Sequence, residues 1–355
     1  MGANLIILAG TLLLPSLQHD TTEHPDQPSH GIGYERLSDL LGYNRVQGLS
    51  LGVGYRARLP GIRSAQAYAT ARYGFSDERV TWRLSVVREF RRGHLRLSGY
   101  SDLLDVDPIS AGRTVGNTIS GILAGHDYGD YAVSRGASVM WESRLGTALV
   151  LKLGTRIERQ SSATRVARSA VNDLLGGSGL FPPNPSVTEG TFATGSAGLS
   201  QRGRINWSLT LDILGGSGHA VGRLFAEARR TFGAGPAITF RIKGGAGTEP
   251  ALPQTVFRLG GLNTVRGFEY GMVLGPGFWA AQVDFALLPG RVRPVVFLDA
   301  GQASRLADLV SSAALVGAGA GVSIFKGLIR LDLSRPISPD IGGKVRFDVV
   351  IQGVR

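Results

Sequence analysis

Residues 258–268 read Arg258-Leu-Gly-Gly-Leu-Asn-Thr-Val-Arg266-Gly-Phe268, and residues 297–301 read Phe297-Leu-Asp299-Ala-Gly301. Both stretches lie beside or within segments in which apolar and polar residues alternate, as they do in β-strands. An arginine on a glycine-flanked loop can fold back against a strand, where an inward-facing aspartate can receive its guanidinium as a bidentate ion pair. We therefore predict that Arg266 is held by Asp299, and also by Asp284 on the intervening strand, inside a hollow β-structure.

The glycines around Arg266 suit this arrangement. Gly260, Gly261 and Gly267 permit the sharp turns and the close backbone approach that an inward-folded loop requires. A guanidinium shielded from bulk water gains about 1.5 to 3 kcal/mol per charge-assisted hydrogen bond, whereas an exposed pair contributes under about 1 kcal/mol. The predicted role of the contact is conformational rather than catalytic.

A period of two runs through the rest of the chain. In residues 204–214, the apolar side chains at odd positions share one face and the polar side chains at even positions share the other. In residues 149–158, the face opposite the leucines carries Lys152, Arg156 and Glu158. Charge of this kind is costly in a dry interior but is tolerated in a water-filled lumen. The sequence therefore predicts an all-β fold, a transmembrane antiparallel β-barrel.

The two motifs resemble those of the BamA/TamA superfamily of outer-membrane assembly and secretion barrels, also described as the bacterial surface antigen barrel domain. The family signature, Val-Arg-Gly-Phe or Tyr on the sixth extracellular loop and Phe-x-Asp-x-Gly downstream, is matched here by Val265, Arg266, Gly267 and Phe268, and by Phe297, Asp299 and Gly301. The resemblance covers residues 44–355 and begins with Tyr43-Asn44-Arg45-Val46-Gln-Gly48-Leu49.

This resemblance implies a sixteen-stranded barrel in the bacterial outer membrane, with an extracellular loop folded into its lumen. It also implies a function in the insertion or translocation of polypeptides, with outer-membrane lipids, lipopolysaccharide and client polypeptides as partners. Family members carry soluble periplasmic repeats, for which residues 1–43 are too short. Either the chain is the carboxyl-terminal piece of a longer protein, or it works with separate periplasmic partner proteins.

Fifteen segments are strand candidates, because turn residues bound an alternating pattern in each. They are 46–58, 64–75, 79–90, 93–102, 131–144, 146–159, 191–201, 204–214, 219–232, 236–247, 277–288, 291–301, 312–325, 327–335 and 344–355. Since a bacterial barrel closes with an even number of strands, one more strand is expected, within 103–130 or 160–190. The second of these regions also has a helical pattern at 166–175.

The resemblance further implies a seam between the first strand, 47–58, and the last, 344–355, which opens toward lipid. Glycines in these strands weaken pairing or permit a kink, and those at the predicted seam are Gly48, Gly52, Gly54 and Gly353. The last strand departs from the family pattern, because it ends in Gly-Val-Arg355 where the family has a terminal aromatic residue.

Residues 1–43 form a separate segment in this interpretation. Their apolar part, Leu5–Leu14, is about half of the roughly 20 residues that a spanning helix needs, and it is interpreted as an export signal or a truncated remnant. Residues 19–30 contain His19, His24 and His30 but no fixed ligand spacing, so we expect a polar linker rather than a metal site. A short amphipathic helix is expected over 34–43, before the barrel domain at 44–355.

The amino-acid composition and motifs argue against several classes of function. The net charge of +11 comes from 34 arginines and 4 lysines, but they are dispersed along alternating strands, so nucleic acid is not an expected partner. The absence of cysteine suits export through an oxidising compartment. The six histidines are scattered without a readable triad, and 317–321, Gly-Ala-Gly-Ala-Gly, lacks the strand-turn-helix context of a dinucleotide loop. We therefore expect no enzyme activity, cofactor or metal. A passive diffusion pore is the alternative function, and a hydrolase on the barrel wall is the least favoured one.

Overall fold

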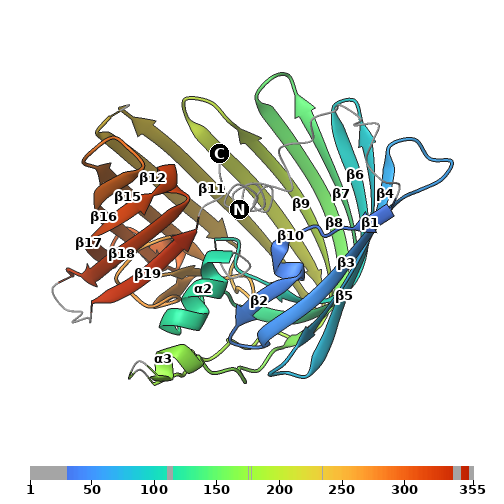
Figure 1. Cartoon of the computed structure of the whole chain (residues 1–355), viewed down its shortest axis with the longest axis horizontal. Helices are drawn as coiled ribbons and strands as arrows, with labels where there is room; N and C mark the ends of the chain where they lie inside the picture. The colour runs from blue at the N-terminus through green and yellow to red at the C-terminus, as the bar shows by residue number, and fades with distance from the viewer. Residues whose placement is uncertain are drawn as a thin grey trace, which may run out of the picture.

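The computed structural model of the chain describes residues 30–109, 115–174, 176, 178–233, 235–338 and 345–351. Within them, seventeen strands form one large sheet, which curves around an interior (Figure 1). Neighbouring strands in this sheet pair antiparallel, as at β7–β8 and β15–β16. The expected all-β, antiparallel barrel fold is confirmed.

Fifteen strands follow one another around the wall. Their bounds are β3 Gly48–Arg58, β4 Ala65–Gly74, β5 Arg79–Phe90, β6 Gly93–Asp105, β7 Tyr131–Leu145, β8 Leu149–Ser162, β9 Gly190–Gln201, β10 Asn206–Gly216, β11 His219–Phe232, β12 Ala237–Gly247, β15 Gly277–Ala286, β16 Val292–Ser304, β17 Leu315–Ile324, β18 Ile329–Pro336 and β19 Arg346–Ile351. Each of the fifteen candidate segments overlaps one of these strands, with bounds that differ by a few residues, because alternation is a local property of the sequence.

The remaining two strands share one edge of β3. The short strands β1, His30–Ile32, and β2, Leu41–Asn44, pair with the two ends of β3 in the registers His30↔Ala57 and Leu41↔Leu51. Residues 33–40, which contain the 3-10 turn η1 at Leu37–Asp39, leave the sheet between them. The two pieces together fill the sixteenth strand position, which the sequence analysis placed wrongly at 103–130 or 160–190.

The helix expected over 34–43 is also wrong. The backbone of this segment pairs with the edge of β3 instead, since Gly52 N donates to Leu40 O at 2.8 Å. Just before the segment, Gly33 N donates to Gly54 O at 3.1 Å. The sheet therefore begins at His30 among the described residues, before the expected domain boundary at 43/44.

The barrel is apolar outside and polar inside. Val53 on β3 is 74% exposed and Ile157 on β8 is 61% exposed, whereas Glu158, one residue further, is 1% exposed. The outward-facing Leu209, Leu211 and Ile213 of β10 are exposed as well. This arrangement is the reverse of that in a water-soluble protein, where alternation places apolar side chains in the core. Neither helix among the described residues has the length and apolarity needed to cross a membrane.

The longest described connections lie at one end of the barrel. The β6–β7 connection contains the helix α2, Val115–Ala124, and the β8–β9 connection contains α3, Ala170–Leu174 (Figure 1). The helical pattern expected at 166–175 is therefore confirmed for 170–174 only. The β12–β15 connection, residues 248–276, contains the short antiparallel pair β13, Phe257–Leu259, and β14, Val273–Gly275. Two further 3-10 turns are η2, Leu306–Asp308, and η3, Phe325–Gly327.

Candidate functional site

Residues 248–276, hereafter the lumen loop, fold into the barrel. Phe257, Leu259 and Val265 of this loop are 0% exposed. They pack in one hydrophobic cluster with wall residues, among them Phe278 on β15 and Leu315 on β17. The loop therefore stays in the interior through apolar contacts, and its polar groups must find partners there.

Arg266, at the tip of the lumen loop, lies against the wall. Its Nε and Nη2 donate to the two carboxylate oxygens of Asp299 at 2.6 Å each, in the bidentate geometry expected from the sequence. Nη2 also lies 2.9 Å from Asp284 Oδ1, and Nη1 lies 3.4 Å from Asp332 Oδ2. The guanidinium carbon lies 3.7 Å from the ring centroid of Phe297. One side chain thus joins the loop to three strands.

The side chains that make these contacts are shielded from solvent. Arg266 is 4% exposed and Asp299 is 0% exposed. Burial by itself lowers the pKa of Arg266, but its hydrogen bonds to Asp299 and the charges of Asp299, Asp284 and Asp332 outweigh burial and hold that pKa above its usual range. Arg266 therefore remains charged, and its carboxylate partners depend on it.

Sequence reasoning missed two members of this cluster, Arg330 and Asp332. Arg330 Nε donates to Asp332 Oδ1 at 2.7 Å, and Arg330 Nη2 donates to Asp284 Oδ1 at 2.9 Å. Both side chains occupy the polar face of β18, which was the signal that could have found them. The ion-pair cluster, defined as Arg266, Arg330, Asp284, Asp299 and Asp332, therefore contains two arginines and three aspartates.

The sequence Gly317-Ala-Gly319-Ala-Gly321 on β17 forms the surface on which the cluster rests. A Cβ at Gly317 would lie 1.9 Å from Arg266 O, and one at Gly319 would lie 2.4 Å from the Phe297 ring. One at Gly321 would lie 2.0 Å from the carboxylate of Asp332. These glycines lie within the strand candidate 312–325, but their role as the contact surface for Arg266 was not predicted.

The predicted loop glycines adopt backbone conformations that favour glycine. Gly260, Gly261 and Gly267 have φ of 116°, 83° and 94°, within the left-handed region. Gly301 instead allows close packing of the lumen loop, because a Cβ there would lie 3.1 Å from the side chain of Val265. Phe268 is 3% exposed in the apolar cluster beside the loop.

A second group of buried charges ties the lumen loop to the start of the wall. Arg45 N donates to Asp127 Oδ2 at 2.7 Å, and Arg45 Nη1 lies 3.7 Å from Asp130. Asp130 also pairs with Arg258 of the lumen loop. All four side chains are nearly fully buried, so the β2–β3 turn, the β6–β7 connection and the lumen loop are held as one unit.

The seam is bordered by other elements than those predicted. Among the described residues, β3 pairs with β1 and β2 and not with β19, so a seam between 47–58 and 344–355 is wrong as stated. Instead α2 lies between β2 and β19 (Figure 1): Tyr43 N donates to Thr118 Oγ1 at 3.3 Å, and Ser120 Oγ donates to Val349 O at 3.0 Å. Asp348 of β19 also contacts His126, at 3.2 Å, and Tyr128.

The glycines at the predicted seam allow close backbone approach or a turn, which is a different role from weakening the strand pairing. A Cβ at Gly52 would lie 2.1 Å from Asp39 O, and one at Gly54 would lie 2.2 Å from Gly33 O. Both therefore let residues 33–40 cross the inner side of β3. Gly48 has φ of 60° at the β2–β3 turn, and Gly353 lies outside the described residues.

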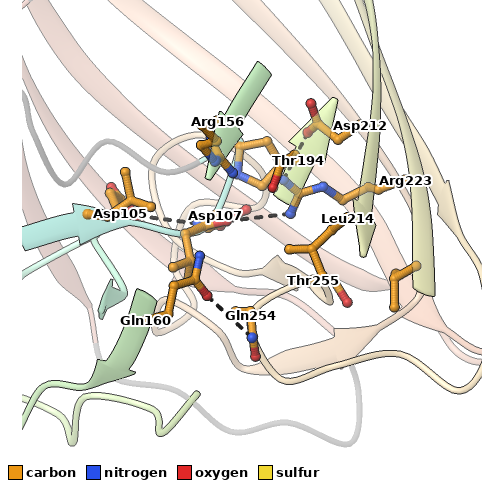
Figure 2. Close-up of a pocket in the computed structure, with 14 residues that line it drawn as sticks. Asp105, Asp107, Arg156, Gln160, Thr194, Asp212, Leu214, Arg223, Gln254 and Thr255 are labelled. Atoms are coloured by element: carbon orange, nitrogen blue, oxygen red, sulfur yellow. Dashed lines mark hydrogen bonds and ion pairs between the residues drawn. The ribbon is translucent and has the colours of Figure 1, made fainter. Parts of the chain in front are cut away.

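A cavity of about 220 Å³ lies beside the lumen loop, between the end of β6 and the inner face of β8 to β11 (Figure 2). Arg223 Nη2 donates to Asp212 Oδ2 at 3.1 Å at one side of it. Gln254 of the lumen loop donates to Gln160 on β8 at 3.3 Å at another. The cavity is therefore polar, with charged groups of both signs, as expected of a water-filled lumen.

Asp107, which lines this cavity, titrates unusually. Burial raises the pKa of its carboxyl to about 6, although hydrogen bonds from Tyr270 Oη and Ile109 N oppose the shift. The folded state therefore binds this proton more tightly than the unfolded state does. The protein consequently loses stability as the pH rises from the ordinary carboxyl pKa to about 6, and the whole penalty is present above that value.

We expect Asp107→Asn to remove this penalty while retaining an acceptor for Ile109 N. The free energy of unfolding in urea should rise by about 1 to 3 kcal/mol near pH 8 and change little below about pH 4. Urea titrations of the parent and the variant at both pH values measure this difference. An equal gain at both values would contradict the assignment.

Within the part of the chain that the structure describes, no group of three or more histidine or acidic side chains is arranged to hold an ion. His19 and His24 lie outside the described residues, so the expectation for that stretch stays a prediction.

Comparison with known proteins gives a fold and no established activity. A model of the C-terminal domain of a family of unknown function (DUF5686) matches residues 19–172, which is less than half of the 355 residues. No curated protein matches the chain. BamA from Haemophilus ducreyi, solved without POTRA domains 1–3, is similar with a TM-score of 0.60 and 12% identity, over 91% of this chain and 70% of that one. At this identity the likeness is one of fold.

Two CdiB structures are similar as well. CdiB from Acinetobacter baumannii has a TM-score of 0.45 and 15% identity, over 87% of this chain and 57% of that one. CdiB from Escherichia coli has a TM-score of 0.47 and 14% identity, over 87% of this chain and 60% of that one.

Proposed function

We propose that the protein is an outer-membrane β-barrel of the BamA/TamA type, which assists the insertion or translocation of polypeptides at a lateral seam. The membrane location is supported by the outer face, where side chains such as Val53 and Ile157 expose apolar surface while the inner face buries charge. Hydrocarbon outside and water inside is the one environment in which both faces are satisfied. The fold similarity to BamA supports the same location.

The seam carries the functional part of the proposal. Between β2 and β19 the wall is completed by α2 through a few side-chain hydrogen bonds, such as Ser120 to Val349 O. Such contacts separate at far lower cost than a ladder of backbone hydrogen bonds, because each exchanges for water or another partner singly. A client strand or a translocating segment would enter the wall at this position.

A passive diffusion pore is the second candidate, and the polar cavity beside Arg223 favours it. Against it stands the lumen loop, which the ion-pair cluster fixes across the interior. The proposed partners are outer-membrane lipids, lipopolysaccharide, client polypeptides and separate periplasmic partner proteins, without nucleic acid. The proposed function involves no catalytic residue.

The test restrains the seam with a reducible crosslink. The chain has no cysteine, so His126→Cys and Asp348→Cys, whose parent side chains lie 3.2 Å apart, provide a unique pair for a bifunctional thiol reagent. In liposomes that contain the crosslinked protein, we expect an unfolded client barrel to fold no faster than in empty liposomes. Reduction of the reagent should restore the rate of the uncrosslinked double variant.

A matched pair on the opposite wall provides the control. The hydroxyls of Thr231 and Thr239 lie 2.9 Å apart on β11 and β12, and a crosslink between cysteines there should leave client folding unchanged. Parent protein that fails to accelerate client folding would refute the assembly function. A large, steady conductance that both crosslinks leave intact would identify the pore instead.

A further inference from the structure

In the helix α2, the small and polar face is buried and the apolar face is accessible. Gly116, Asn117, Ser120 and Gly121, which are small or polar, form its buried face. The face left accessible carries Val115, Thr118, Ile119, Ile122 and Leu123, which are apolar apart from the threonine, and Leu123 is 44% exposed. A surface helix in water shows the opposite distribution, with its apolar stripe toward the core.

The two polar side chains on the buried face of α2 are hydrogen-bonded within the protein. Asn117 Nδ2 donates to Asp127 Oδ1 at 2.8 Å, and Asn117 Oδ1 accepts from Tyr128 N at 2.7 Å. Ser120 donates to Val349 O on β19. At Gly121 a Cβ would lie 3.3 Å from the Tyr43 ring of β2. The orientation of the helix is therefore set by its polar and small side, and the apolar side points away by consequence.

The surfaces on both sides of α2 are also apolar. On β2 and its partner strand, Leu41 and Leu51 are each 47% exposed on the outer face. On β19, Phe347 is 43% exposed, beside the 54% exposed Leu333 of β18. Figure 1 places α2 between these two flanks. The accessible face of α2 thus continues the apolar outer wall across the gap between β2 and β19.

We infer that the accessible face of α2 is a lipid-contacting surface, at which the hydrocarbon of the membrane meets a helix instead of a strand. A helix satisfies its own backbone hydrogen bonds, so it can border hydrocarbon between β2 and β19, whose described residues form no backbone ladder with each other. This assignment makes α2 part of the membrane-facing wall. It rests on the proposed outer-membrane location.

Single cysteines report the surroundings of each position without background, because the chain has none. Ile119→Cys and Leu123→Cys are labelled with an environment-sensitive fluorophore in phosphatidylcholine vesicles, with and without brominated phosphatidylcholine. Val53→Cys, on the outward face of β3, is the lipid reference. Lys152→Cys, whose parent side chain is 45% exposed and paired with Glu142 on the inner face, is the lumen reference.

We expect brominated lipid to quench the labels at 119 and 123 as strongly as the label at 53, and to leave the label at 152 bright. Quenching at 53 without quenching at 119 and 123 would overturn the inference and leave the membrane location standing. In that case aqueous iodide distinguishes water from a protein cover over α2, and both results count against lipid contact. No quenching at 53 would refute the membrane location itself.

Discussion

Arg266→Met is expected to cause the largest loss of stability of any single substitution in this protein. The variant leaves Asp299, Asp284 and Asp332 facing one another, with Arg330 as the remaining cation of the cluster. Removing one partner of a buried ion pair costs about 3 to 5 kcal/mol, because the other charge remains desolvated. We expect a loss of that size in the free energy of unfolding, measured in urea with the protein in detergent micelles.

Arg266→Lys should recover only part of this loss. An ammonium is a point charge, so it cannot donate to Asp299 in the bidentate geometry and at the same time stack on Phe297. The lumen loop should therefore become sensitive to protease in both variants, more so in Arg266→Met. Digestion within residues 248–276 measures this directly.

Arg305→Met is the matched control for the arginine substitutions. Arg305 pairs with Glu249 at 3.1 Å, but its side chain is 72% exposed, so solvent screens the pair. An exposed pair contributes under about 1 kcal/mol. If Arg266→Met changed the unfolding free energy as little as Arg305→Met does, the ion-pair cluster would not be what holds the lumen loop.

Gly317→Ala is expected to give the second largest effect. The added methyl would lie 1.9 Å from Arg266 O, a backbone atom that cannot move without shifting the tip of the lumen loop. Forcing an extra methyl into a packed site costs about 1 to 3 kcal/mol. We expect a comparable fall in the free energy of unfolding, together with faster proteolysis of the lumen loop.

Gly195→Ala provides the same chemical change in open space. Gly195 lies on the wall strand β9, and a Cβ there would meet nothing within 4 Å. It should therefore leave stability unchanged or raise it slightly, since alanine restricts the unfolded chain. Equal effects of the two substitutions would mean that Gly317 matters as a strand residue and not as the contact surface for Arg266.

The strands and the faces of the wall could be predicted because each depends on successive residues. Leu209, Leu211 and Ile213 face outward for the reason that they occupy alternate positions of one strand. The pair Arg266–Asp299 could be predicted as well, because its residue types and flanking glycines are visible in two short motifs.

Other parts of the candidate site could not be predicted, because their patterns in the sequence are weak. Asp332 and Arg330 stand on the inner face of β18, but many inward charges share that property, and only their distance from Arg266 distinguishes them. The interrupted strand at 30–32 and 41–44 escaped prediction because each piece is shorter than the window over which alternation can be recognised.

The sequence by itself determined that this chain forms strands with an apolar and a charged face, and that an arginine loop folds inward onto an aspartate. Tertiary structure alone decided which element completes the wall and which glycines the lumen loop packs against. Ser120 and Val349 are 229 residues apart, and they meet only because the curved sheet brings its two ends to α2. Periodicity is fixed by neighbours along the chain, whereas the contacts at the seam are fixed by the curvature summed over every strand between them.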